Sequence, residues 1–354
     1  MRNKRIDLLR VIAIFFIVWL HSATDKVFSV AFVQISAVPV HVFFLLAGYF
    51  CFGKTDKQLW KRILYLILVY VISNLLFFII CCITTNSSPI SYLKGLYTGV
   101  GFKKFFLNFF AFNIFLPGQL GGHLWYLSAF IIAIIALIIV KRKFPLPISI
   151  TLYFIGVVFS RIILPIKNVT VSSYCFRNGI FEAIPMVFLG HYLHLIKDKT
   201  QSVYKRKTLF FCVCATVLTV SYVILTVIHK KLGLYSDLDF FNVIIALTLF
   251  FLFAYPSKSN DKNPILNVTA FIGARLTLYI YIIHPLFIFI FSKILSGFAV
   301  TLFSFLASLA VSYLYYELKI TFKDLLNKRK QKNCSQELKE EIQEEIKEDS
   351  ANGQ

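Results

Sequence analysis

Charged residues are scarce in this chain of 354 residues: Asp, Glu, Lys and Arg make up 15% of it, whereas 58% is hydrophobic. A soluble domain of this size could not bury so much apolar surface. Several apolar runs are also long enough to cross a bilayer core about 30 Å thick. The composition therefore excludes an ordinary soluble enzyme and predicts an all-α, polytopic bundle of transmembrane helices.

Disulfide and zinc-binding patterns are absent as well. The chain has seven cysteines, most of them in or beside apolar runs, and no C-x-x-C pair. Because both kinds of site normally show paired spacing, we expect neither, and no metal. Gly95, Gly99 and Gly101 do not form a phosphate-binding loop, since no strand precedes them. The net charge of +20 comes from Lys and Arg in loops between apolar runs, which indicates membrane topology rather than nucleic-acid binding.

Ten apolar windows have the length of a membrane span. They cover residues 6–24, 33–52, 63–83, 123–140, 146–164, 176–195, 208–228, 238–255, 275–293 and 298–318. With the N-terminus in the cytoplasm, most of the loop Lys and Arg residues lie there too, as the positive-inside rule requires. We therefore predict about ten spans in a domain over residues 1–320, both termini in the cytoplasm, and a charged cytoplasmic tail over residues 321–354.

The first window is unusual because it contains Asp7, Arg10 and His21. A charged side chain near the centre of a bilayer costs at least ~2.5 kcal/mol, so such residues usually pair, face a cavity or act in function. At about 100° per residue, Arg10 and His21 return to nearly the same helix face, roughly 16 Å apart along the axis. Asp7 precedes Arg10 by one helical turn, so the two can form an ion pair.

His21 is the sharpest candidate for proton transfer. Imidazole titrates near neutral pH, so His21 can act as the general base that takes a proton from a hydroxyl nucleophile. A structural histidine between two helices is the alternative, and Arg10 on the same face favours function. Arg10 can hold an anionic group, such as the phosphates of a thioester donor, or simply neutralise Asp7. The residues alone leave these two roles of Arg10 open.

Glu182 is another acidic residue expected deep inside a span. Asn178 lies one turn before it, so both side chains can face one cavity. There Glu182 would lie opposite His21 or Arg10. An ion pair between Glu182 and Arg177 or a lysine that only joins two helices is the alternative.

His284 precedes Pro285, which frees a backbone carbonyl and often marks a bend that lines a cavity. Structural packing is the alternative for this histidine. His123 and Trp125 begin the window at 123–140, where aromatic rings are expected at the membrane interface and where the same rings can also bind a sugar.

Lys61 and Arg62 lie at the inner end of the third window. They are first expected to anchor that end by the positive-inside rule, and secondly to hold a phosphate of a donor. Other histidines, including His41, His191 and His194, show no spacing with carboxylates that is typical of a metal site. We assign them no role.

Several segments resemble, in the same order, those of the integral-membrane acyltransferase 3 family, which includes O-antigen and capsule O-acetyltransferases. The segments are RIDLLRVIA at 5–13 with His21, PVHVFFLLAGYF at 39–50, KRIL at 61–64, HLWYL at 123–127 and YIIH at 281–284. Ordered matches over most of the membrane region are more specific than any single motif.

This resemblance implies a helical fold of about ten spans in the bacterial cytoplasmic membrane. It also implies transfer of an acyl group, usually acetyl from acetyl-CoA, to a hydroxyl of an envelope glycan, with acyl-CoA as a donor substrate and no bound cofactor. Arg10 and His21 match the family's functional pair. Asp7 and Glu182 would assist them in catalysis. The residues expected to contact the donor are Lys61 and Arg62, and those expected to contact the acceptor are His284, Tyr281, Asn178, Arg177, His123 and Trp125.

Two positions depart from the family's pattern: Ala47 stands where members commonly have Ser, and Tyr65 stands where a second basic residue often follows Arg62. The segment 177–190 is similar to the membrane part of vancomycin-resistance serine racemases, members of the same family that are associated with serine uptake. Two alternatives to an acyltransferase therefore stay open. One is a transporter of a small polar solute, such as a serine-like amino acid, or of a glycan intermediate, and the other is a membrane scaffold whose buried charges only pair helices.

Overall fold

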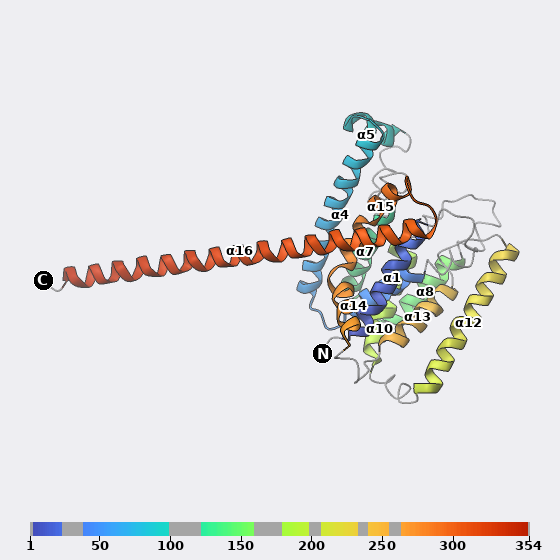
Figure 1. Cartoon of the computed structure of the whole chain (residues 1–354). Coiled ribbons are helices and arrows are strands. Elements are labelled where there is room, and N and C mark those ends of the chain that lie inside the picture. Colours follow the sequence, from blue (N-terminus) through green and yellow to red (C-terminus); the bar gives the residue numbers. More distant parts are fainter. Residues whose placement is uncertain are drawn as a thin grey trace.

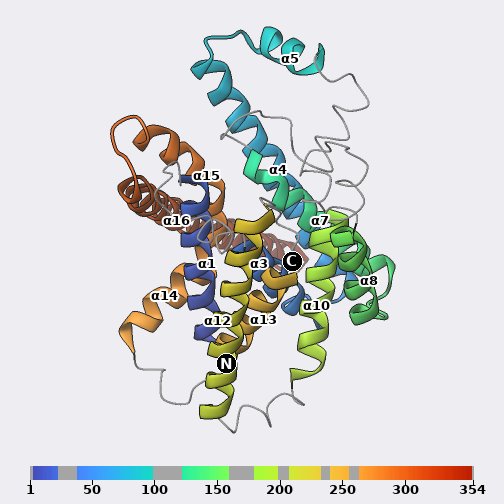
Figure 2. The same cartoon turned by 90° about the vertical axis from the view of Figure 1, so that its right-hand side faces the viewer.

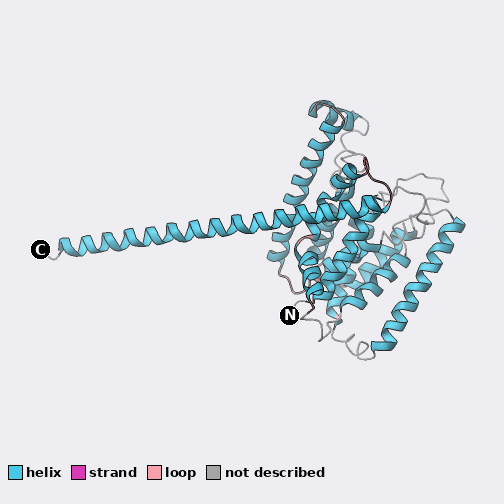
Figure 3. Ribbon diagram, in the orientation of Figure 1, coloured by secondary structure: helices cyan, strands magenta, loops and turns pink. Residues whose placement is uncertain are grey.

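The computed structural model of the chain describes residues 3–22, 38–98, 122–158, 179–197, 207–232, 240–254 and 263–352. In these residues the chain forms helices joined by turns, and it forms no strand (Figure 3). The prediction of an all-α fold is confirmed.

Each of the ten windows predicted to span the membrane contains a helix (Figure 1). These helices are α1 (Lys4–Ser22), α3 (Val38–Tyr49), α4 (Asp56–Thr84), α7 (Trp125–Ile139) with the preceding 3-10 turn η2 (Gly122–Leu124), α8 (Pro145–Val158), α10 (Ile184–Leu195) with the preceding π-helical turn η5 (Gly179–Ala183), α12 (Lys207–Leu232), α13 (Phe240–Ala254), α15 (Thr277–Phe291) and α16 (Phe298–Asn352). Two further helices, α5 (Pro89–Thr98) and α14 (Pro264–Arg275), lie outside the windows.

Three helices of the described part are long and apolar enough to cross a membrane on their own: α4, Gly122–Ile139 and Phe298–Arg329. A fourth span would consist of α14 and α15 together, which are bent by 79° relative to one another. Shorter apolar helices are Val38–Tyr49, Pro145–Val158, Thr208–Ile224 and Phe240–Ala254. The number of spans and the side on which each terminus lies remain predictions.

Capping residues set the starts of two helices, α14 and α4. α14 begins at Pro264, whose missing N–H costs nothing at the first helical position, and the side chain of Asn263 accepts hydrogen bonds from two backbone N–H groups of its first turn. α4 begins at Asp56, before the predicted residue 63, because Thr55 and Gln58 form a capping box. The donor candidates at 61 and 62 therefore lie on a helix.

α16 packs against α15 and α1 and then extends away from the bundle (Figure 1). A quarter turn of the molecule shows this helix nearly end-on (Figure 2). It continues to Asn352, so no break in the helix marks the predicted boundary at residue 320.

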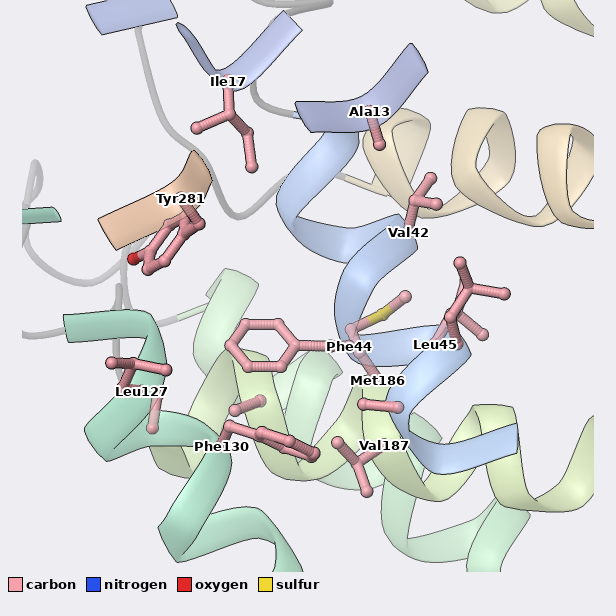
Figure 4. Packing of buried hydrophobic residues seen from close by; sticks show 14 of the residues in the cluster. Ala13, Ile17, Val42, Phe44, Leu45, Leu127, Phe130, Met186, Val187 and Tyr281 are labelled. Carbon is pink, nitrogen blue, oxygen red and sulfur yellow. The ribbon is translucent and has the colours of Figure 1, made fainter. Parts of the chain in front are cut away.

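The core is formed where α3 crosses α10 and where α1, α7 and α15 approach the same region. Phe44 and Leu45 of α3 and Val187 of α10 are fully buried there (Figure 4). The crossing requires small residues: a Cβ on Gly48 would overlap the carbonyl oxygen of Val187, and a Cβ on Gly190 would overlap that of Leu45. This close packing fixes the position of α3, which forms one wall of the cavity described below.

Candidate active site

The cavity has a volume of about 260 Å³ and lies between α1, α3, α4, α7, α14 and α15. Arg10 and His21 both line it, as expected from their positions on one face of α1. Much of the remaining wall is aromatic, with Phe43, Tyr126 and Phe130 among its residues. The cavity therefore combines an apolar interior with a few polar groups, which is the usual character of a small-molecule site.

Arg10 is held by the predicted ion pair. Its Nη1 donates to Asp7 Oδ1 at 2.9 Å, and the Asp7 carboxylate is only 1% exposed. The guanidinium also lies over the ring of Phe50, with Cζ 4.6 Å from the ring centre. Both contacts orient the Arg10 side chain, and the ion pair reduces the cost of placing its charge in an apolar helix.

Arg62 supplies a second cation to the cavity. Its Nη1 lies 3.7 Å from Cys51 Sγ, and its Cζ lies 4.9 Å from the ring centre of Phe130. Lys61 is exposed and does not line the cavity. Adjacent residues of a helix point about 100° apart, so a helix that presents Arg62 to the cavity turns Lys61 away from it.

Three histidines that are far apart in the sequence meet beside the cavity. The ring centres of His21 and His284 are 5.3 Å apart, those of His123 and His284 are 5.1 Å apart, and those of His21 and His123 are 6.3 Å apart. His21 and His123 line the cavity, whereas His284 is fully buried behind them. In the described part of the chain, no group of three or more His, Cys, Asp or Glu side chains is placed to hold a metal ion.

Backbone carbonyls hold two of these rings. His123 Nε2 lies 3.2 Å from the carbonyl oxygen of Ile282, and His284 Nδ1 lies 2.7 Å from that of Tyr281. The hydroxyl of Tyr281 donates to the backbone carbonyl of His123. Of the residues predicted to contact the acceptor, His123, Trp125 and Tyr281 line the cavity.

Glu182 lies elsewhere. It is 1% exposed and lies on the π-helical turn η5, with Oε1 3.9 Å from Nδ1 of His41. Nε2 of His41 in turn lies 3.1 Å from the Tyr153 hydroxyl. Glu182 does not line the cavity. The structure therefore does not place it at the expected position opposite His21 or Arg10.

Sequence reasoning missed the buried group that His41 forms with Tyr153 and Glu182. A histidine inside an apolar window is itself a signal, but its partners come from α8 and η5 and show no local spacing with it. The two other predicted residues near Glu182, Arg177 and Asn178, lie outside the described residues.

Comparisons with known proteins show the family of the chain. No solved structure matches the chain. An amino-acid racemase of Enterococcus faecalis is 26% identical over 362 aligned residues, which cover 94% of this chain and 48% of the racemase. The chain thus spans about half the length of this curated relative. The profile of a family described as "Acyltransferase domain" matches residues 3–317, nearly the whole described bundle. The chain therefore belongs to this family of membrane acyltransferases.

Proposed function

We propose that this acyltransferase moves an acyl group, usually acetyl in such enzymes, from acyl-CoA to a hydroxyl of a cell-envelope glycan, in the bacterial cytoplasmic membrane. The observation that carries the proposal is one cavity with two cations, Arg10 and Arg62, and a histidine cluster around His21. Along α1, Arg10 and His21 are roughly 16 Å apart. Anion binding and proton transfer can therefore take place at separate positions of the same space.

The two guanidinium groups support a negatively charged donor. Arginine binds phosphate and carboxylate groups through forked hydrogen bonds. At about 260 Å³ the cavity is smaller than the ~300–1,000 Å³ of pockets that enclose a whole drug-sized ligand. It suits the acyl-thioester end of the donor and the acceptor hydroxyl, with the rest of coenzyme A outside.

His21 is suited to the role of general base. As the acceptor oxygen attacks the thioester carbonyl, His21 takes the hydroxyl proton. The carbon–sulfur bond then breaks, and the coenzyme A thiolate takes that proton from His21 as it leaves. The products are an ester and free coenzyme A, and His21 returns to its neutral form. Aromatic walls formed by residues such as Trp125 and Tyr126 would contact the sugar.

A second function, transport of a small amino acid, is favoured by one observation. The relative from Enterococcus faecalis is named an amino-acid racemase, and this chain matches 48% of it. A membrane half that supplies an amino acid to such an enzyme would use the same cavity without an acyl donor. Uptake of radiolabelled serine into cells with and without the gene separates this function from acyl transfer.

The test of acyl transfer is His21→Ala. Envelope glycans from cells that express the variant are analysed by mass spectrometry, with the amount of protein in the membrane measured in parallel. Acetylation is expected to fall to the level of cells without the gene, because general-base help is worth ~10²–10⁴ in rate. His194→Ala is the matched control, since His194 lies on α10 against the Tyr49 carbonyl and outside the cavity. Full acetylation by His21→Ala would refute the proposal.

A further inference from the structure

The sequence His284-Pro285 fixes the proton on one nitrogen of His284. In an α-helix the carbonyl of Tyr281 would accept a hydrogen bond from the N–H of residue 285, but proline has none. His284 Nδ1 takes this place, 2.7 Å from the Tyr281 oxygen and 3.3 Å from the Ile280 oxygen. Because a carbonyl oxygen only accepts, Nδ1 of His284 carries the proton and Nε2 presents a bare lone pair.

His123 has the opposite tautomer. Its Nε2 donates to the carbonyl oxygen of Ile282 at 3.2 Å, so its Nδ1 presents the lone pair. The two histidines thus use different ring nitrogens for the same purpose. Each ring is anchored on the backbone of α15 and leaves its other nitrogen as a hydrogen-bond acceptor.

Both acceptors are buried and have no hydrogen-bond partner within the described residues. Buried polar atoms are almost always paired, because an unmade hydrogen bond leaves the cost of desolvation uncompensated. The ring centre of His284 lies 5.3 Å from that of His21, a separation at which facing ring nitrogens come within hydrogen-bonding reach. The ring centre of His123 lies 6.3 Å from that of His21, which is too far for such a hydrogen bond. The acceptor of His284 is therefore the one that His21 can reach.

We propose that His284 is a positioning residue whose Nε2 accepts a hydrogen bond from one N–H of His21 and stabilises the doubly protonated form of His21. The other ring nitrogen of His21 is then the one that takes the proton of the acceptor hydroxyl. A hydrogen bond from a charged donor is stronger than one from a neutral donor. The stabilisation is therefore larger in the charged intermediate and in the transition state that leads to it than in the resting enzyme. The proton itself stays on His21 until the thiolate takes it.

This inference rests on the proposed function, in which His21 is the general base, and it changes the expected role of one residue. His284 was expected to contact the acceptor substrate. Here it acts through His21, so its loss should lower kcat and leave the KM for the acceptor unchanged. Fixed dipoles that are already oriented need no rearrangement during the reaction, and such stabilisation is often a large contribution to catalysis.

Nitrogen-15 NMR of the full-length protein in lipid nanodiscs, labelled at histidine, tests the two tautomers directly. Spectra of His123→Asn and His284→Gln assign the signals by subtraction. We expect the resting protein to carry the proton of His284 on Nδ1 and that of His123 on Nε2. The reverse tautomer of His284 would overturn the inference. This measurement requires no substrate.

Kinetics test the role. Release of the coenzyme A thiol from acetyl-CoA is followed at varied concentrations of N-acetylglucosamine as the soluble hydroxyl probe. His284→Leu should lower kcat about 10- to 100-fold with an unchanged KM, the loss expected for one hydrogen bond to a charged group. His284→Gln places an amide oxygen near the former Nε2 and should recover most of this loss. His194→Leu is the control histidine and should keep the wild-type kcat.

The outcomes separate the possible failures. Equal losses of kcat in His284→Leu and His284→Gln would indicate a structural role and overturn the inference. A raised KM with normal kcat would indicate contact with the acceptor and would also overturn it. If the wild-type protein releases no thiol with any acceptor, the proposed function fails. The NMR experiment still decides the tautomers in that case.

Discussion

The Asp7–Arg10 pair offers the clearest measurable energy at the site. Asp7→Asn keeps the shape of the side chain and a hydrogen-bond acceptor but removes the charge. Two unit charges about 4 Å apart attract by about 4 kcal/mol at an effective dielectric constant near 20. Asp7 is 1% exposed and Arg10 is 18% exposed, so the pair is only partly screened by water in the cavity. Because Asn retains one hydrogen bond, we expect a loss of about 3 kcal/mol in the free energy of unfolding, at the lower end of the range for breaking a buried pair.

The assay is reversible unfolding in mixed detergent micelles, followed by circular dichroism, for four proteins. These are the wild type, Asp7→Asn, Arg10→Met and the double variant. If the two residues interact as the 2.9 Å contact indicates, the double variant should be more stable than the sum of the single changes predicts. An Asp7→Asn variant within about 0.5 kcal/mol of wild type, with additive single effects, would refute the reasoning.

Three further predictions concern Arg10, the crossing of α3 with α10, and the buried carboxylate of Glu182. Arg10→Lys should raise the KM for acetyl-CoA about tenfold in steady-state assays, because lysine cannot form the forked contact, and an unchanged KM would argue for charge neutralisation alone. Gly48→Ala should lower the free energy of unfolding by about 3 kcal/mol, since the added methyl group meets the backbone of Val187; Gly95→Ala, where the space is open, should not destabilise. Glu182→Gln should lower stability by about 1–3 kcal/mol while leaving kcat and both KM values near those of wild type, and a large loss of kcat would restore its predicted catalytic role.

Local features of the active site could be predicted from the sequence alone. Apolar length located a helix in each of the ten windows, because backbone hydrogen bonds must be satisfied within a segment that crosses lipid. Helix geometry placed Asp7 within reach of Arg10 and placed Arg10 and His21 on one face. Pro285 predicted a freed backbone carbonyl in this helix, and the ring of His284 donates to that carbonyl, which belongs to Tyr281.

Contacts between distant segments were decided only by the tertiary structure. His21, His123 and His284 meet because α1, η2 and α15 pack around one space, and no local spacing relates these positions. The partner of Glu182 is His41, since the close crossing of α3 and α10 brings η5 against α3. Such crossings depend on many small apolar contacts summed over whole helices, together with a few glycines that permit close approach. Spacing within one helix determines which residues share a face of that helix. The residues that they contact on other helices depend on how the entire bundle packs.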